Sequence, residues 1–485
     1  MVLSVALVAM APPAGAGADQ ATIAAQVGDT PTGQAMPSGF VGISFEYRAM
    51  HVYAGRDPRV VNPVLVNLLK GLAPGQRPVL RIGGNSTDQT WWPIRGMIPP
   101  AGITYTLTKG WLRTTQALVR ALGAHLIMGV NLASGRPAIA VAEARAILEG
   151  IGQSYIQALE IGNEPDLYGM FAWYRDRGRM VLSRSNDYSP TLFTDDFSRW
   201  QAALPALPLA GPAFAGVAWM SDLDNFLDAE PAVRVVTFHR YPLRGCVQDP
   251  TDPFYASIPN LLADSSSAGL AQQVAPYVAD AHARGDRFRL DELNSAACAG
   301  RRGVSNTFAS ALWALDTLFN MAAVGVDGVN IHTLPTSAYE PFTFSHVAGR
   351  WRAFVHPIYY GLLLFAQAFP PGATLLPVTA PSGAVKIWAT QAPDGTTRVV
   401  LINKSPDTPV QVQLQLPGAQ TLAGAESLLA PGLRATTGVT LGGLTFGAQT
   451  TTGRLPGLAQ LTQISPAGGS YTVNLPVASA VMLTR

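Results

Sequence analysis

The stretch Ile156-Gln-Ala-Leu-Glu-Ile-Gly-Asn-Glu-Pro-Asp166 joins a short apolar run to a polar end that contains a proline. The run predicts a β-strand over Ile156–Gly162, and Pro165 ends it because proline has no amide hydrogen to donate to a sheet. A helix-like stretch, Ala138–Leu148, precedes this strand, and another strand-like run, Leu207–Ala213, follows it. This order is typical of βα units, which build parallel sheets.

The same alternation extends over residues 41 to 345. Further helical stretches are predicted at Trp111–Leu122 and Thr307–Ala323, between short apolar runs. The candidate strands are Phe40–Phe45, Pro78–Ile82, His125–Asn131, Ile156–Gly162, Leu207–Ala213, Val233–His239, Arg287–Asp291 and Gly328–His332. Eight strands with intervening helices favour a closed (β/α)8 TIM barrel over an open doubly wound sheet.

The character of the sequence changes after the helix predicted at Pro357–Ala368. Alternating runs separated by Gly, Pro, Asp and Ser turns predict an all-β sandwich at the C-terminal end. Its clearest strands are Val385–Thr390, Arg398–Asn403, Val410–Leu416 and Tyr471–Leu475. The segment Ala21–Val27 also looks like a strand, and we expect it to join this sheet. The predicted parts are thus a signal segment over 1–18, N-terminal strands over 19–39, a catalytic barrel over 40–370 and a β-sandwich over 371–485.

Composition and charge indicate a globular protein and argue against a nucleic-acid-binding one. Apolar residues make up 48% of the 485 residues and charged residues 13%, which is enough apolar surface for a large core. The net charge of +2 and the lack of a basic stripe argue against a nucleic-acid partner. Residues 2–10 are apolar and are followed by small residues, which is typical of a secretory signal, although no positive region precedes them; a disordered tail is the alternative. We expect a secreted or periplasmic protein that does not insert into a membrane.

Two glutamates stand where a barrel enzyme places its chemistry, at the carboxyl ends of strands. Glu164 follows the fourth strand, and Glu292 follows the seventh in Phe288-Arg-Leu-Asp-Glu-Leu-Asn294. A retaining glycosidase needs two carboxyl groups about 5 to 5.5 Å apart, one as nucleophile and one as general acid and base. Asn163 suits a hydrogen bond to a sugar 2-hydroxyl. We therefore predict Glu164 as the acid/base and Glu292, with the cationic Arg81 beside it, as the nucleophile.

Several stretches resemble glycoside hydrolase family 79 of the clan A retaining glycosidases, whose members include β-glucuronidases and heparanases. They are Ile43-Ser-Phe-Glu-Tyr47, Leu80-Arg-Ile-Gly-Gly-Asn-Ser-Thr-Asp88, Glu160-Ile-Gly-Asn-Glu-Pro-Asp166, Phe238-His-Arg-Tyr-Pro242 and Glu292-Leu-Asn-Ser295. The resemblance covers the barrel and extends to the C-terminal β domain. It implies the same two catalytic glutamates, and it implies that Tyr241 hydrogen-bonds the nucleophile.

Other polar residues at strand ends are candidates for substrate binding, each with a structural alternative. Glu46 accepts distal sugar hydroxyls or pairs with an arginine. Asn85 and Asp88 reach the sugar from their glycine-rich loop or cap its turns. His239 binds substrate or is a core histidine. The remaining candidates are Arg81, Asn163, Tyr241, Asn294 and Tyr339.

Two further expectations concern metals and cysteines. Neither His239 nor His332 has the partner spacing of a metal site, so we expect no catalytic metal and no other cofactor. The chain has two cysteines, Cys246 and Cys298, each just beyond a predicted barrel strand. In an exported protein they form one disulfide, or else they remain two unlinked thiols.

The sequence departs from family 79 where that family binds the uronate carboxylate. Ala297 stands where the resemblance implies a tyrosine, and Cys298 where it implies a glycine. Tyr339 then matches a second carboxylate-binding tyrosine, and Arg301 or Arg302 offers a charged alternative. The expected function is a retaining exo-β-glycosidase of the β-glucuronidase type acting on a glycoside or oligosaccharide. A β-glucosidase or β-xylosidase, and a non-catalytic carbohydrate-binding protein, are the alternatives.

Overall fold

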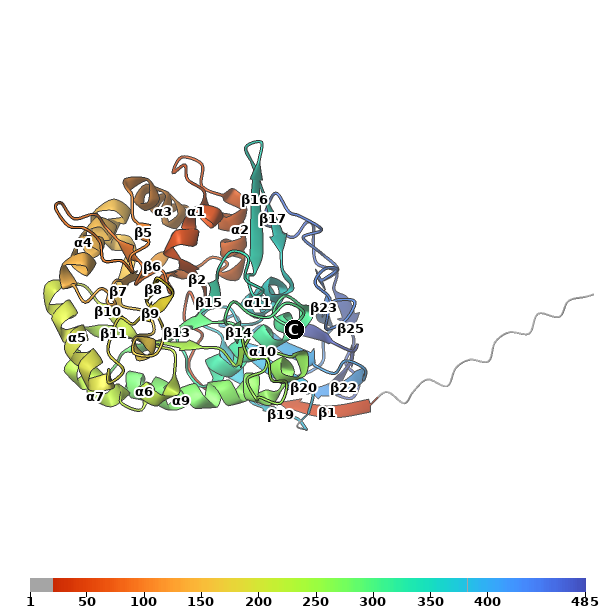
Figure 1. Cartoon of the computed structure of the whole chain (residues 1–485). Coiled ribbons are helices and arrows are strands. Elements are labelled where there is room, and N and C mark those ends of the chain that lie inside the picture. The colour runs from red at the N-terminus through yellow and green to blue at the C-terminus, as the bar shows by residue number, and fades with distance from the viewer. Residues whose placement is uncertain (1–20, 382) are drawn as a thin grey trace, which may run out of the picture.

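The computed structural model describes residues 21–381 and 383–485 (Figure 1), so the predicted signal segment over 1–18 lies outside the described residues. Eight parallel strands close into a barrel, which confirms the predicted TIM-barrel class. In chain order they are β2 (Val41–Glu46), β3 (Val79–Gly83), β6 (His125–Val130), β7 (Ile156–Ile161), β10 (Leu209–Phe214), β11 (Val233–Arg240), β13 (Arg287–Leu293) and β15 (Gly328–Thr333). All eight lie where the sequence places them, within a few residues at each end.

Helices surround the barrel (Figure 1) and bury their apolar faces against the strands. The helices are α1 (Met50–Ala54), α2 (Pro63–Leu72), α3 (Lys109–Leu122), α4 (Pro137–Ile147), α5 (Pro190–Ala203), α6 (Val217–Met220), α7 (Leu223–Ala229), α8 (Ile258–Leu262), α9 (Ala268–Ala283), α10 (Phe308–Ala323) and α11 (Pro357–Ala368). Local sequence sets their ends. In α3 the Thr108 side chain accepts a hydrogen bond from the Trp111 amide, and Gly123 takes the left-handed conformation that ends the helix.

The C-terminal part consists of two sheets that pack on each other, as predicted. The larger sheet contains β18 (Thr374–Leu376), β20 (Val385–Gln391), β21 (Thr397–Asn403), β27 (Ser479–Thr484), β23 (Ala423–Leu429), β24 (Thr440–Leu441) and β25 (Thr462–Ile464). The smaller sheet contains β19 (Val378–Thr379), β1 (Ala21–Val27), β22 (Val410–Gln415) and β26 (Ser470–Leu475). Because β1 pairs in parallel with β22, the N-terminal strand joins this region as expected.

A buried ion pair ties the β-sandwich to the barrel. Lys404, just beyond β21, places its ammonium 2.6 Å from the Asp316 carboxylate on α10. The indole nitrogen of Trp388 donates to the other Asp316 oxygen at 2.9 Å, and its ring stacks on Phe319 at 5.4 Å. The two parts therefore share a packed and electrostatically paired interface.

Short strand pairs lie in the loops that follow the barrel strands. They are β4 (Thr90–Trp91) with β5 (Tyr105–Thr106), β8 (Tyr174–Asp176) with β9 (Arg179–Val181), β12 (Leu243–Arg244) with β14 (Ala296–Ala297), and β16 (Phe342–Val347) with β17 (Arg350–Val355). Short helical turns are η1 (Tyr47–Ala49), η2 (Leu148–Gly152), η3 (Gln153–Tyr155), η4 (Pro165–Leu167) and η5 (Asp264–Ser266).

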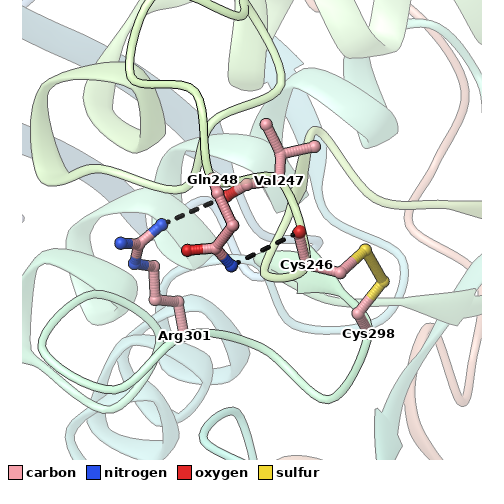
Figure 2. The surroundings of a disulfide bond; sticks show 5 residues. All are labelled: Cys246, Val247, Gln248, Cys298 and Arg301. Atoms are coloured by element: carbon pink, nitrogen blue, oxygen red, sulfur yellow. Dashed lines mark hydrogen bonds between the residues drawn. A yellow bond between two sulfur atoms is a disulfide. The ribbon is translucent and has the colours of Figure 1, made fainter.

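The pairing of β12 with β14 brings the two cysteines together. Cys246 and Cys298 form a disulfide with a Cα–Cα distance of 5.7 Å (Figure 2), so the bonded alternative is the one confirmed. The bridge links the loops after β11 and β13, and Glu292 lies within β13 itself. Among the described residues, no helix combines the length and apolar character that crossing a bilayer requires.

Candidate active site

Glu292 lies near the end of β13 with its carboxylate held from several sides. Tyr241 donates to one oxygen at 2.6 Å, and the Arg81 guanidinium donates to the other at 2.7 Å. His332, on β15, places Nδ1 3.6 Å from the same oxygen as Arg81. The carboxylate is therefore fixed by partners from three neighbouring strands and loops.

Arg81 is the hub that links the polar groups at the barrel mouth. It projects from β3, is fully buried, and donates to Glu160 at 2.9 Å and to Asn163 at 2.8 Å as well as to Glu292. A planar guanidinium presents five donors in fixed directions, so one side chain can orient several acceptors at once. Arg81 thus couples the nucleophile candidate to the strand that carries Glu164.

Glu164 stands on the sharp turn between β7 and η4. Its backbone adopts the left-handed region (φ 51°), a conformation that is uncommon for residues other than glycine and that often marks functional sites. Its amide donates to the Ala213 carbonyl at 3.0 Å, and its carboxylate lies 3.1 Å from Nδ1 of His239. The turn directs the Glu164 side chain toward the barrel mouth.

The two glutamates meet over the mouth. One oxygen of Glu164, one oxygen of Glu292 and a ring nitrogen of His239 all lie within 4.8 Å of one another. This separation matches the short spacing of retaining glycosidases and is less than the roughly 6.5 to 9.5 Å that an inverting enzyme leaves for a water molecule. The arrangement is suited to attack by one carboxylate and proton transfer by the other on a single sugar carbon.

Electrostatics keep Glu292 ionised. Burial by itself raises the pKa of this carboxyl group, but interactions with His332, His239 and Arg81 outweigh burial, and the Tyr241 hydrogen bond adds to them. The resulting pKa is about 2. For His239, burial by itself lowers the pKa. The neighbouring carboxylates Glu292 and Asp291 outweigh burial and raise the pKa of His239 to about 9. An anionic Glu292 at neutral pH is what a nucleophile requires.

A buried carboxyl pair lies below the two glutamates, and the sequence did not single it out. Glu160 and Asp291 are fully buried, and Arg81 contacts both, at 2.7 and 3.5 Å. Burial and the adjacent Glu160 raise the pKa of Asp291 well above its usual value, whereas Arg81 keeps that of Glu160 low in spite of burial. Glu160 is thus the stronger acid of this buried pair. The positions of both residues could have been noticed in the sequence, because each is an acidic residue within an otherwise mostly apolar predicted strand.

The loop after β3 is held by acidic side chains. Glu46 accepts from the backbone amides of Asn85 and Ser86, at 3.1 and 2.7 Å, and is buried. Asp88 accepts from the amides of Leu132, Ala133 and Asn163 and from the Tyr168 hydroxyl. Both Asp88 oxygens are therefore used within the protein. Asp88 thereby holds Asn163 in place, and its sugar contact stays a prediction.

Asn163 and Asn294 differ in what they reach. Asn163 receives Arg81 on its oxygen, and its amide nitrogen donates to the exposed Asn85 at 3.3 Å, which leaves both asparagines at the mouth. Asn294 is fully buried and donates to the carbonyls of His332 and Tyr339 at 2.9 and 3.3 Å. Asn294 thus joins two backbone segments, and its substrate contact stays a prediction.

Tyr339 lies beside Tyr241 at the mouth, with ring centroids 6.3 Å apart and little exposed surface. Arg301 is directed away, since it donates to the Val247 carbonyl (Figure 2) and to the Tyr255 hydroxyl. Arg302 is exposed. Of the groups considered for a substrate carboxylate, Tyr339 therefore lies nearest the two glutamates.

Carboxylate and histidine clusters at the mouth also raise the question of a metal. Glu160, His239 and Asp291 form one such cluster, and Glu164, His239 and Glu292 form another. The guanidinium of Arg81 contacts members of both, at 2.7 Å from Glu160 and 2.7 Å from Glu292. A cation already sits among these carboxylates, so the residues present do not fit a metal ion well.

Comparisons with known proteins show similarity to glycoside hydrolases. The model of the glycosyl hydrolase family 79 C-terminal β domain matches residues 387–482. A β-glucuronidase of Aspergillus niger is 24% identical over 513 aligned residues, which cover 92% of this chain and 90% of that protein. The chain is a glycoside hydrolase, and its C-terminal part is similar to the family 79 β domain. A β-glucuronidase of Neurospora crassa is 25% identical over 60% of this chain, and the match covers only 56% of the Neurospora protein.

Solved structures show the same fold around this glycoside hydrolase site. A 4-O-α-L-rhamnosyl-β-D-glucuronidase from Fusarium oxysporum superposes with a TM-score of 0.72 at 20% identity, covering 95% of this chain and all of that one. A family 51 arabinofuranosidase from Xanthomonas axonopodis pv. citri gives a TM-score of 0.67 at 16% identity, with 96% and 100% coverage. The barrel with its β-sandwich is thus a shared glycosidase architecture.

Proposed function

We propose that this chain is a retaining, exo-acting β-glucuronidase, with Glu292 as nucleophile and Glu164 as general acid and base. The observation that carries the proposal is the approach of a Glu164 oxygen and a Glu292 oxygen to within 4.8 Å, together with the depressed pKa of Glu292. The β-glucuronidase relatives support the choice of sugar.

The reaction proceeds as two displacements. In the first, Glu292 attacks the anomeric carbon while Glu164 delivers its proton to the glycosidic oxygen, so the C–O bond breaks and the aglycone leaves as an alcohol. In the second, Glu164 takes a proton from water, and the oxygen of that water attacks the anomeric carbon and releases Glu292 as a carboxylate. Glu164 is then protonated again, and the anomeric configuration is retained.

The other groups at the mouth support these steps. Arg81 and Tyr241 hold the attacking carboxylate and prevent it from rotating out of line, which is a positioning contribution. Asn163 lies between Arg81 and Asn85 at the mouth, and we assign it a hydrogen bond to the sugar 2-hydroxyl that strengthens in the transition state. The long loops around the mouth favour a pocket and thus exo action.

For the sugar that the enzyme cleaves, one observation favours a second candidate. Ala297 and Cys298 replace two carboxylate-binding positions that the resemblance implies, and Cys298 is locked in the disulfide. This favours a neutral β-glucoside or β-xyloside as the second candidate substrate. Tyr339 supports the uronate, because its phenol lies at the mouth and can donate a hydrogen bond to a carboxylate.

A panel of aryl β-glucuronide, β-glucoside and β-xyloside decides the sugar by comparing kcat/KM. The glucuronide should be cleaved fastest, and Tyr339→Phe should lower its kcat/KM more than that of the glucoside. A preference for the glucoside or xyloside in the unmodified enzyme would replace β-glucuronidase with the second candidate. Turnover of none of the three would point to the non-catalytic carbohydrate-binding alternative.

The roles of the glutamates are tested separately from the sugar. Glu164→Ala should lose most activity on poor leaving groups, and azide should partly restore turnover of activated aryl substrates, because azide can replace water without a general base. Anomeric NMR of the first product should show retention. Wild-type behaviour of Glu164→Ala, or an inverted product, would refute the mechanism.

We also propose that the protein acts outside the cytoplasm. The Cys246–Cys298 disulfide supports this, because such bonds persist mainly in oxidising compartments. Fractionation of the native host should find the activity outside the cytoplasm, and purely cytoplasmic activity would contradict the proposal.

A further inference from the structure

An apolar surface lies directly beside the turn that carries Glu164. Met170 and Phe171 are 60% and 64% exposed, and both backbone amides donate to the Leu167 carbonyl at 3.0 Å. Leu167 is the last residue of η4, three positions after Glu164. The backbone that carries these two large apolar side chains is therefore hydrogen-bonded to the segment of the acid/base candidate.

A third exposed apolar side chain lies on the other loop that is bonded to this turn. Asp166, within η4, accepts from the amides of Ala215 and Gly216 at 3.0 and 2.8 Å, so the loop after β10 is fastened to the turn. The next residue, Val217, begins α6 and is 42% exposed. Exposed apolar side chains therefore lie on both loops that are hydrogen-bonded to η4.

Aromatic rings connect the two loops beneath these side chains. Tyr188 stacks on Tyr168 with centroids 6.3 Å apart and contacts Trp219 of α6 at 5.7 Å. Trp173 is anchored by its indole nitrogen to the Asp88 carbonyl at 2.8 Å. The two loops that carry the exposed apolar side chains are thus linked by packed aromatic rings, which fixes these loops relative to the Glu164 turn.

The role of Glu164 as acid/base indicates which part of a substrate lies next to these exposed apolar side chains. The acid/base must hydrogen-bond the glycosidic oxygen, so the aglycone lies on the Glu164 side of the scissile bond. We propose that Met170, Phe171 and Val217 form the aglycone subsite, and that it takes an apolar or aromatic aglycone in preference to a further sugar. This inference rests on the proposed glycosidase mechanism and does not depend on which sugar occupies the pocket.

A set of β-glucuronides with three aglycones tests the subsite. The aglycones are 2-naphthol, phenol and glucose; the first two are phenols and differ chiefly in apolar area. The measurement is kcat/KM for each, because this parameter covers binding and the first displacement, in which the aglycone is still attached. A matching β-glucoside series is run in parallel, so that a wrong choice of sugar does not hide the result.

In the Met170→Ser/Phe171→Ser double variant, kcat/KM for the naphthyl substrate should fall on the order of tenfold relative to that for the glucosyl substrate. About 60 Å² of lost apolar contact corresponds to about that factor. The phenyl substrate should show a smaller loss. A kcat limited by the second displacement should not change, since the aglycone has already left. Leu458→Ser is the matched control, because Leu458 is 91% exposed in the C-terminal part of the chain.

Each outcome decides a different point. An unchanged ratio of naphthyl to glucosyl kcat/KM, an equal loss on all aglycones, or the same loss in Leu458→Ser overturns the aglycone subsite. A change in oligomeric state of the double variant without a change in the ratio would overturn it too, and would assign the surface to contact between copies. Absence of turnover by the wild-type enzyme in both sugar series overturns the proposed function itself, and the subsite with it.

Discussion

Replacement of Tyr241 by phenylalanine removes a single interaction from the candidate nucleophile. The Tyr241 hydroxyl donates to Glu292 at 2.6 Å, whereas Arg81 and His332 approach the other oxygen. Phenylalanine keeps the ring that packs beside Tyr339 and deletes only the donor. The variant therefore isolates the contribution of this hydrogen bond to the ionisation of Glu292.

The expected size follows from the charge on the acceptor. A hydrogen bond to a charged group contributes about 1.5 to 3 kcal/mol, and one pKa unit corresponds to about 1.36 kcal/mol. The pKa of Glu292 in the wild type is about 2. In Tyr241→Phe it should rise by about one to two units. At pH 3 the ionised fraction of Glu292 would then fall from about nine-tenths to about a quarter for a pKa near 3.5.

The same shift has a consequence for stability. The folded pKa of Glu292 is depressed below its ordinary value of 4.5, so its ionisation stabilises the folded state above that pH. This stabilisation is lost as the pH falls toward 2. In Tyr241→Phe the contribution of Glu292 ionisation to the free energy of unfolding is smaller by about 1.5 to 3 kcal/mol. This contribution is then lost completely at a higher pH than in the wild type.

The assay is the pH dependence of kcat/KM on an activated aryl glycoside, whose acid limb reports the free enzyme. Tyr359→Phe is the matched control, because the Tyr359 hydroxyl is buried and donates to the Leu68 carbonyl away from the mouth. The acid limb should move up in Tyr241→Phe and stay in place in Tyr359→Phe. An acid limb that does not move in Tyr241→Phe, with the protein folded, would refute our account of Glu292.

Three further predictions concern stability. Lys404→Met should lower the free energy of unfolding by about 3 to 5 kcal/mol, because it leaves Asp316 buried without its cation, and the double variant Lys404→Met/Asp316→Leu should recover much of that loss in thermal melts. Cys246→Ser/Cys298→Ser should cost up to about 4 kcal/mol in denaturant titrations, since the bond closes a loop with a sequence separation of 52; an unchanged midpoint would show that the loop is constrained without the bond. Burial, more than the charge of Glu164, raises the pKa of Asp166 to about 6 from 3.8, so its ionisation should destabilise the fold as the pH rises from 4 to 6. Asp166→Asn should remove this pH-dependent loss of about 3 kcal/mol in the free energy of unfolding. The same pH dependence of stability in both proteins would contradict the raised pKa of Asp166.

The barrel was predictable because its signal is local. Each strand is a short apolar run bounded by a turn, and each helix carries an apolar face, so eight repeats of this order indicate the closed barrel. The positions of Glu164 and Glu292 follow from the same reasoning, since strand ends of a parallel barrel share one face. The attachment of Ala21–Val27 to the C-terminal sheet was likewise visible as an alternating run in front of the first barrel strand.

The contacts within the site were not local and could not be read from spacing. Asp88 and Asn294 look like substrate ligands in the sequence, because polar residues beside catalytic glutamates often are. In the structure, Asp88 accepts from the Leu132 amide and Asn294 donates to the His332 carbonyl, backbone groups that lie more than 35 positions away in the chain. The contrast in acidity between Glu160 and Asp291 could not be read from spacing either, because it depends on burial and on Arg81.

The sequence by itself determined the periodic pattern of elements and the strand ends at which the two glutamates stand, because apolar periodicity and turn residues act over a few neighbouring positions. Tertiary structure alone decided which polar groups meet. Arg81 reaches Glu160, Asn163 and Glu292 only because β3, β7 and β13 converge on one interior. Ionisation there depends on distances across the barrel and on the exclusion of water, and neither quantity is encoded in any single stretch of the chain.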